Sequence, residues 1–186
     1  RNIKIYFNKN NGFGRSMNLA VKKIKTNYFF QISPDLEFNF KQLKTFYEVA
    51  KKLKDKFSAL GPRFVNVNKK SHKQSDRKKT VANINAVHGS AMFINKAKFN
   101  LIGGIDEKIF LYFEENDYCR RGKEMNLNAF QLNKIIIKKK GQTVEFDRKK
   151  EQLDLQNLLS WHFIWSKFYF SQKKNGRFIS IIIFLP

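Results

Sequence analysis

Short apolar runs alternate with stretches of helical periodicity along this chain of 186 residues. Residues 3–7 have the composition of a β-strand, and apolar positions between about residues 15 and 25 recur at the spacing of one helix face. A second apolar run, residues 28–32, ends abruptly at Ser33. Strand, helix and strand in this order is typical of a parallel sheet. We therefore predict an α/β fold with a mixed, mostly parallel sheet flanked by helices.

The rest of the chain continues this alternation. Asn39 is placed to cap a long helix that Gly61-Pro62 ends, and Asn95 to cap a short helix that ends at Gly103-Gly104 in a left-handed turn. The other predicted elements are the long helix over residues 40–60, strands over 64–67, 87–94, 129–132 and 135–137, and helices over 114–125 and 153–174.

The chain carries 37 Lys and Arg against 15 Asp and Glu, a net charge of +22. Such charge can bind nucleic acid through its phosphates, but no signature of a known nucleic-acid-binding module accompanies it. An AT-rich genome also enriches lysine, and a basic surface can face anionic lipid or a diphosphate instead. We therefore do not expect nucleic acid as the partner, and a basic nucleic-acid-binding module remains the alternative.

Composition also limits the class of protein. Hydrophobic residues make up 42% of the chain, which is enough for about one domain with a genuine core. The single cysteine excludes an intramolecular disulfide framework and indicates a reducing compartment. No apolar run approaches the roughly 18–20 residues of a membrane span. We expect a cytoplasmic protein, with peripheral contact at the inner face of the plasma membrane as an open alternative.

Two acidic segments could carry chemistry. Asp35 and Glu37 follow a predicted strand end, where ligands of α/β sheets bind, and together could hold Mg²⁺ or Mn²⁺; the alternative is a turn that begins the next helix. Glu114 and Glu115 start a predicted helix beside the apolar run 110–113. The helix dipole accounts for part of this clustering. An apolar wall raises a carboxylate pKa, which makes Glu115 our candidate general base.

Two further segments leave their function open. Residues 87–92 contain small side chains that would admit a ligand close to the backbone, although His88 alone is more often a core or rim histidine. The aromatic helix over residues 153–174 suits a membrane interface, or packs on the sheet or on a dimer partner.

Five blocks along the chain carry a resemblance to a known family: Asn11-Gly-Phe-Gly-Arg-Ser-Met-Asn18, Ser33-Pro-Asp-Leu-Glu37, His88-Gly-Ser-Ala-Met92, Gly103-Gly-Ile-Asp-Glu107 and Phe110-Leu-Tyr-Phe-Glu-Glu-Asn-Asp-Tyr-Cys-Arg-Arg121. They occur in the order and spacing of family 2 glycosyltransferases. The chain resembles this family, most closely its rhamnosyltransferase-like branch, over about residues 3–143.

The resemblance implies a GT-A fold and inverting transfer of a sugar, with rhamnose suggested by the branch, from a nucleotide-diphosphate donor. The acceptor would be a saccharide or a lipid-linked molecule of cell-surface polysaccharide synthesis. The implied roles are a general base at Glu115, a divalent cation held by Asp35 and Glu37, donor or diphosphate binding by Gly12, Arg15, Asn18 and Asp35, and acceptor-side positions at His88, Gly89, Asp106 and Glu114.

The chain departs from the family pattern in several places. Ser33 stands where a first acid is often found, Glu115 replaces an aspartate, and Lys138-Lys139-Lys140 stands where many relatives have a histidine. The opening strand and helix of the family would precede Arg1. We therefore expect a fragment with a catalytic domain over residues 1–145 and a basic helical extension over 146–186. A catalytically inactive, transferase-like interaction domain is the second alternative.

Overall fold

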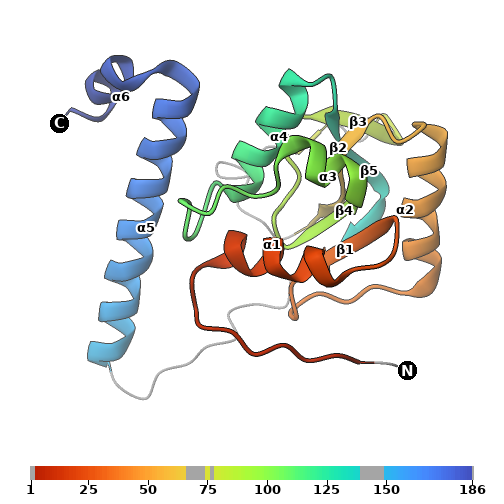
Figure 1. The fold of residues 1–186 in the computed structure, drawn as a ribbon, viewed down its shortest axis with the longest axis horizontal. Coiled ribbons are helices and arrows are strands. Elements are labelled where there is room, and N and C mark those ends of the chain that lie inside the picture. The colour runs from red at the N-terminus through yellow and green to blue at the C-terminus, as the bar shows by residue number, and fades with distance from the viewer. Residues whose placement is uncertain (1–2, 66–73, 76–77, 139–148, 186) are drawn as a thin grey trace.

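The computed structural model describes residues 3–65, 74–75, 78–138 and 149–185, whose arrangement is shown in Figure 1. One mixed sheet in the order β1-β4-β2-β5-β3 organises them. In the described residues β2 and β5 pair in parallel, whereas β1–β4, β2–β4 and β3–β5 are antiparallel, so the predicted mostly parallel sheet is wrong. The strands are β1 (Tyr28–Ile32), β2 (Phe57–Phe64), β3 (Val81–Ile84), β4 (Ala91–Asn95) and β5 (Asn128–Ile137).

The expected first strand is not formed. Residues 3–7 have no regular secondary structure and run in an extended path below the sheet in Figure 1, and Phe7 is 95% exposed. A strand is stable only when its backbone groups find partners on a neighbour, and β1 instead pairs antiparallel with β4. The predicted strand–helix–strand unit is therefore wrong, although its helix exists as α1 (Phe13–Lys23).

Helices cover both faces of the sheet because its central strands are buried on both sides. Met92 and Ile94 of β4 lie in one core cluster, and Ala91 and Phe93 lie in the other, as strand alternation requires. The first cluster is covered by α1, α3 (Lys96–Ile102) and α4 (Glu114–Glu124), and the second by α2 (Phe40–Lys52). The result is a three-layer α/β arrangement.

The helix predicted over residues 40–60 is shorter than expected. Its start is confirmed, since Asn39 and Gln42 form a reciprocal capping box. It ends at Lys52, after which Lys54 and Asp55 adopt left-handed φ values of 51° and 57° that turn the chain into β2. Gly61-Pro62 therefore lies inside a strand, beside a shift in the β2–β5 register that accommodates the missing proline N–H.

The remaining predictions are confirmed in part. Asn95 caps α3, and Gly103 ends it with φ 89°. Strand β4 begins only at Ala91, so residues 87–90 form a loop, and β5 is one strand where two were predicted. The strand predicted over 64–67 reduces to the end of β2, and its last two residues lie outside the described residues. The tail helix is confirmed as α5 (Lys149–Asn175), followed by the unpredicted α6 (Arg177–Phe184).

None of the helices in the described part of the chain combines the length and apolar character that crossing a membrane requires.

The capping box generates a stability prediction. Asn39→Ala removes the oxygen that accepts from the Gln42 N–H at 2.9 Å, and we expect the free energy of unfolding to fall by about 1 kcal/mol. Urea unfolding followed by circular dichroism measures this change. Asn39→Asp keeps an acceptor and should remain close to the wild type. Equal losses in both variants, or no loss in Asn39→Ala, would show that this hydrogen bond does not stabilise the helix start.

Candidate active site

A pocket of about 470 Å³ opens where β1 ends and the antiparallel β4 begins. The backbone N–H of Ser33, just after β1, donates to the carbonyl of Ser90 at 2.8 Å, which joins the two loops. The volume lies in the range of small-molecule sites. The lining residues come from five segments of the chain: Phe13, Ser33, His88, Gly89, Ser90, Leu111, Tyr112, Phe113, Glu114, Glu115, Asn116 and Phe163.

Glu115 places a partly buried carboxylate in this pocket from the first turn of α4. Burial, with a smaller contribution from the charge of Glu114, raises its pKa to about 7. The backbone N–H of Gly89 bonds to the carboxylate and opposes the rise. A side chain at position 89 would lie 3.3 Å from Oε2 of Glu115, so glycine allows this close approach. A carboxylate with such a pKa can accept a proton near neutral pH.

The apolar wall beside Glu115 is built on an unusual turn. Tyr112 and Phe113 both have φ 69°, a left-handed conformation that costs a bulky residue roughly 1–2 kcal/mol. Leu111, Tyr112 and Phe113 line the pocket, and Glu114 is buried against them with its pKa raised by burial. The pKa of Glu115 is raised by burial in the direction that the sequence predicted, and its role as general base stays a prediction.

Helix α5 holds this turn in place. Ser166 donates its hydroxyl to the Leu111 carbonyl at 2.7 Å, and the Phe163 ring packs on Tyr112 and Phe113 with centroids 5.7 and 5.5 Å away. His162 stacks on Phe110 at 4.6 Å. Sequence reasoning missed Phe163 as a pocket residue. The sequence feature that could have indicated it is Ser166, a small polar residue three positions later in this aromatic helix, which marks the face that packs on the domain.

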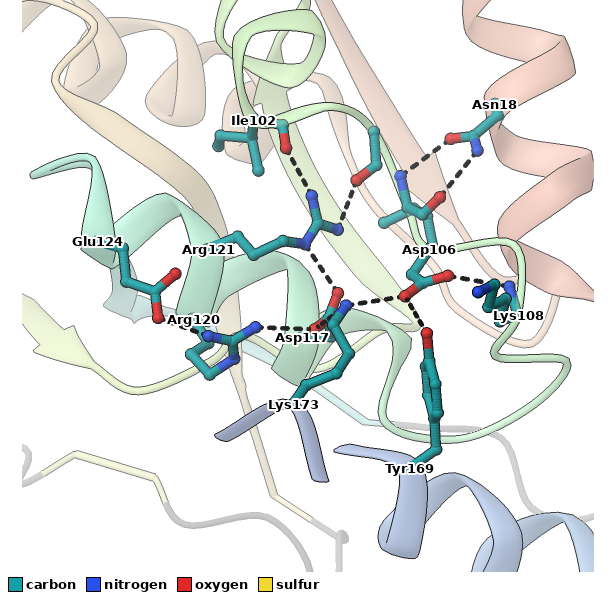
Figure 2. Close-up of polar contacts among 12 residues, drawn as sticks. Asn18, Ile102, Asp106, Lys108, Asp117, Arg120, Arg121, Glu124, Tyr169 and Lys173 are labelled. Atoms are coloured by element: carbon teal, nitrogen blue, oxygen red, sulfur yellow. Dashed lines mark hydrogen bonds and ion pairs between the residues drawn. The ribbon is translucent and has the colours of Figure 1, made fainter. Parts of the chain in front are cut away.

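A buried ionic network fixes α4 and α5 to each other (Figure 2). The fully buried Asp117 carboxylate accepts from Arg121 Nε at 2.8 Å and from Lys173 Nζ of α5 at 2.6 Å. Arg120 completes the set around Asp117 at 3.3 Å. The Arg121 guanidinium also donates to the carbonyls of Ile102 and Gly104, so the network reaches the end of α3.

Asp106 belongs to this network and is not among the pocket residues. Lys173 and the Tyr169 hydroxyl bond to its Oδ2 at 2.7 and 3.1 Å (Figure 2). Burial acts to raise the Asp106 pKa, but the Lys173 bond and the Lys108 N–H together lower it. Its acceptor-side role stays a prediction, and what the geometry shows is an anchor for α5.

Three of the four predicted donor residues, Gly12, Arg15 and Asn18, lie in α1 or just before it, and the fourth, Asp35, follows β1. The Asn18 amide exchanges two hydrogen bonds of 2.9 Å with the backbone of Ile105, and Arg15 lies 3.9 Å from the exposed Glu107. Gly12 has φ 90°, and a side chain there would meet the Phe110 carbonyl at 2.7 Å. Of this segment only the neighbouring Phe13 lines the pocket within the described residues.

The predicted metal ligands, Asp35 and Glu37, are not among the residues that line the pocket. Asp35 is partly buried and Glu37 exposed, two and four residues after Ser33. Among the described residues no group of three or more His, Cys, Asp or Glu side chains could hold a metal ion. Two carboxylates can still bind a cation that shares its other positions with phosphate and water. His88 lines the pocket and its Nδ1 accepts from the Ser90 N–H at 3.1 Å.

Only the first lysine of the basic segment after β5 lies within the described residues. Lys138 is exposed, and Lys139-Lys140 with the residues that follow to position 148 lie outside the described residues.

Comparison with known proteins supports one function class. The chain is 24% identical to the low-salt glycan biosynthesis hexosyltransferase Agl10 of Haloferax volcanii, over 148 positions that cover 68% of this chain. The similarity supports a glycosyltransferase. The match spans about half (48%) of the relative's length. A scan against protein families finds no match.

The raised pKa of Glu115 predicts a pH-dependent stability. The folded pKa of about 7 exceeds the ordinary 4.5, so the folded state holds the proton more tightly. The resulting stabilisation is fully present below about pH 4.5 and is lost as the pH rises to about 7, by up to about 3 kcal/mol.

Urea unfolding at several pH values measures this effect. Relative to Glu115→Gln, which has no proton to lose, the wild type should become less stable across this interval. The exposed Glu48→Gln is the matched control and should follow the wild type. Parallel pH profiles for wild type and Glu115→Gln would contradict the assignment.

Proposed function

We propose that this protein is an inverting glycosyltransferase that moves a sugar from a nucleotide-diphosphate donor to an acceptor hydroxyl. The carrying observation is the Glu115 carboxylate, which lies in a pocket of suitable size with its pKa raised to about 7. The similarity to a hexosyltransferase supports the same class of reaction. The resemblance to family 2 transferases with a GT-A fold supports the inverting course.

In this mechanism the acceptor hydroxyl binds against Glu115. The carboxylate takes the hydroxyl proton while the oxygen forms a bond to the anomeric carbon, and the bond from that carbon to the donor phosphate breaks with its electron pair on the diphosphate. Attack opposite to the leaving group inverts the configuration. Gly89 holds the Glu115 carboxylate through its N–H, and the side chains of residues 111–113 form an apolar wall of the same pocket.

Asp35 and Glu37 are the residues that would hold a divalent cation. Their hard oxygen donors suit Mg²⁺ or Mn²⁺, and they follow the pocket residue Ser33 by two and four positions in the sequence. A bound cation would neutralise charge on the departing diphosphate.

The substrates follow from the same resemblance. We propose rhamnose as the first sugar to test, and a saccharide or lipid-linked acceptor of cell-surface polysaccharide synthesis. A thermal-shift screen of nucleotide sugars with Mn²⁺ on the complete gene product would identify the donor.

Glu115→Gln tests the base. We expect transfer with the best donor of the screen to fall by about 10²–10⁴-fold, with donor affinity unchanged, because the amide cannot accept the proton. Wild-type kcat/KM should rise with pH through the pKa near 7. Glu48→Gln is the control on an exposed helix face. Near-normal turnover in Glu115→Gln would refute the assignment.

Asp35→Ala tests the cation site. We expect most activity to be lost, and the dependence on added Mn²⁺ to disappear, because a ligand to the donor-bound cation is removed. The exposed Asp154→Ala on α5 serves as the control. A metal titration identical to that of the wild type would place the cation elsewhere.

A further inference from the structure

Helix α5 has a second face that the body of the protein does not cover. Its inner face, with Ser166 and Lys173, is bound to the sheet domain. Trp161, Ile164 and Trp165 point away from those contacts and are 58%, 60% and 45% exposed. These three residues line a hollow of about 310 Å³ together with Phe168 and Phe184.

Helix α6 extends this apolar surface. It folds back on the side of α5 that faces away from the sheet (Figure 1) and is held by the Ser171–Ser180 hydroxyl pair at 2.9 Å. Its own apolar side chains are largely uncovered. We call the following residues the outer patch: Trp161, Ile164, Trp165, Phe178, Ile182 and Ile183, the last three being 84%, 70% and 57% exposed.

Cations accompany the outer patch. Lys167 lies over the Phe184 ring at 5.5 Å, and Lys174 and Arg177 are exposed at the α5–α6 junction. The chain as a whole carries +22. A second copy of this chain would bring an equal positive charge to the patch and be repelled, whereas a surface of negative charge would be attracted. Charge complementarity therefore favours an anionic partner.

The side chains indicate which anionic partner fits. Tryptophan is enriched at the boundary between lipid headgroups and acyl chains, and exposed isoleucines gain free energy only when they leave water. An eight-residue helix is about 12 Å long, so α6 can lie in this boundary but cannot cross it.

We propose that the outer patch binds the surface of a membrane that contains anionic phospholipid. The bound helices lie in the plane of the interface, with the patch among the acyl chains and the cations at the headgroups. Tyr112 and Phe163 line the pocket and, together with Ile164 of the patch, also line a second hollow, so the bound protein holds the pocket close to the bilayer. On the proposed transferase function, which this last step assumes, the acceptor is a lipid-linked saccharide.

Tryptophan fluorescence gives a direct test, because both tryptophans of the chain lie in the outer patch. We expect a blue shift and co-sedimentation with vesicles of phosphatidylcholine containing about 30% phosphatidylglycerol, and much weaker binding to phosphatidylcholine alone. Binding should weaken as salt is raised.

Two triple variants separate the patch from general surface effects. Trp161→Ser/Trp165→Ser/Ile182→Ser should reduce vesicle partitioning by about tenfold or more. Phe40→Ser/Val65→Ser/Leu101→Ser removes equally exposed apolar side chains from the body and should bind as the wild type does. Circular dichroism establishes that both remain folded.

Three results would overturn the proposal. These are absence of binding to the anionic vesicles at moderate salt, equal loss of binding in both triple variants, or a dimer in sedimentation equilibrium that the patch variant alone dissociates. None of these measurements depends on catalysis. An inactive protein that binds vesicles would therefore refute the proposed function and leave the membrane surface standing.

Discussion

The geometry of the pocket depends on the burial of one carboxylate, Asp117. Its side chain is fully buried, and its charge is compensated by Arg120, Arg121 and Lys173, which come from two helices. Leaving such a charge without partners costs several kcal/mol, so α4, α5 and the end of α3 must adopt one relative position. Glu115 lies two residues before Asp117 on the same helix, and its place in the pocket is fixed by that arrangement.

The left-handed turn at Tyr112 and Phe113 costs conformational free energy, which the packing of α5 against the turn offsets. The Tyr112 ring packs against Phe163, and the Phe113 ring packs against Phe170. The carbonyl of the preceding residue, Leu111, accepts a hydrogen bond from Ser166. The residues of this turn line the same pocket as Glu115, whose pKa is raised to about 7 by burial. Conformational cost and altered acidity thus occur together, as they commonly do at functional sites. Helix α5 supports both, although the sequence alone separates it from the domain as an extension.

Helix ends were predicted correctly where they depend only on residues close together in the sequence. The caps at Asn39 and Asn95 and the stop at Gly103 are visible in the sequence because their hydrogen bonds join near neighbours. The sheet topology was not predictable, because strand direction depends on partners far along the chain, and residues 3–7 found none among the described residues. The acidic motif at Glu114 and Glu115 predicted two residues that line the pocket. The contacts of the adjoining apolar turn with α5, such as the bond from Ser166 to Leu111, span 55 residues and leave no periodic pattern in the sequence.

The strand order has a consequence for synthesis on the ribosome. The central strand β2 is complete at residue 64 and its neighbour β4 at residue 95, yet its parallel neighbour β5 spans Asn128–Ile137, so the edge of β2 that faces β5 stays unpaired until the later segment has left the exit tunnel. Helix α5 emerges later still. The nascent chain therefore exposes one apolar strand edge between the synthesis of β2 and that of β5, and such an edge favours aggregation.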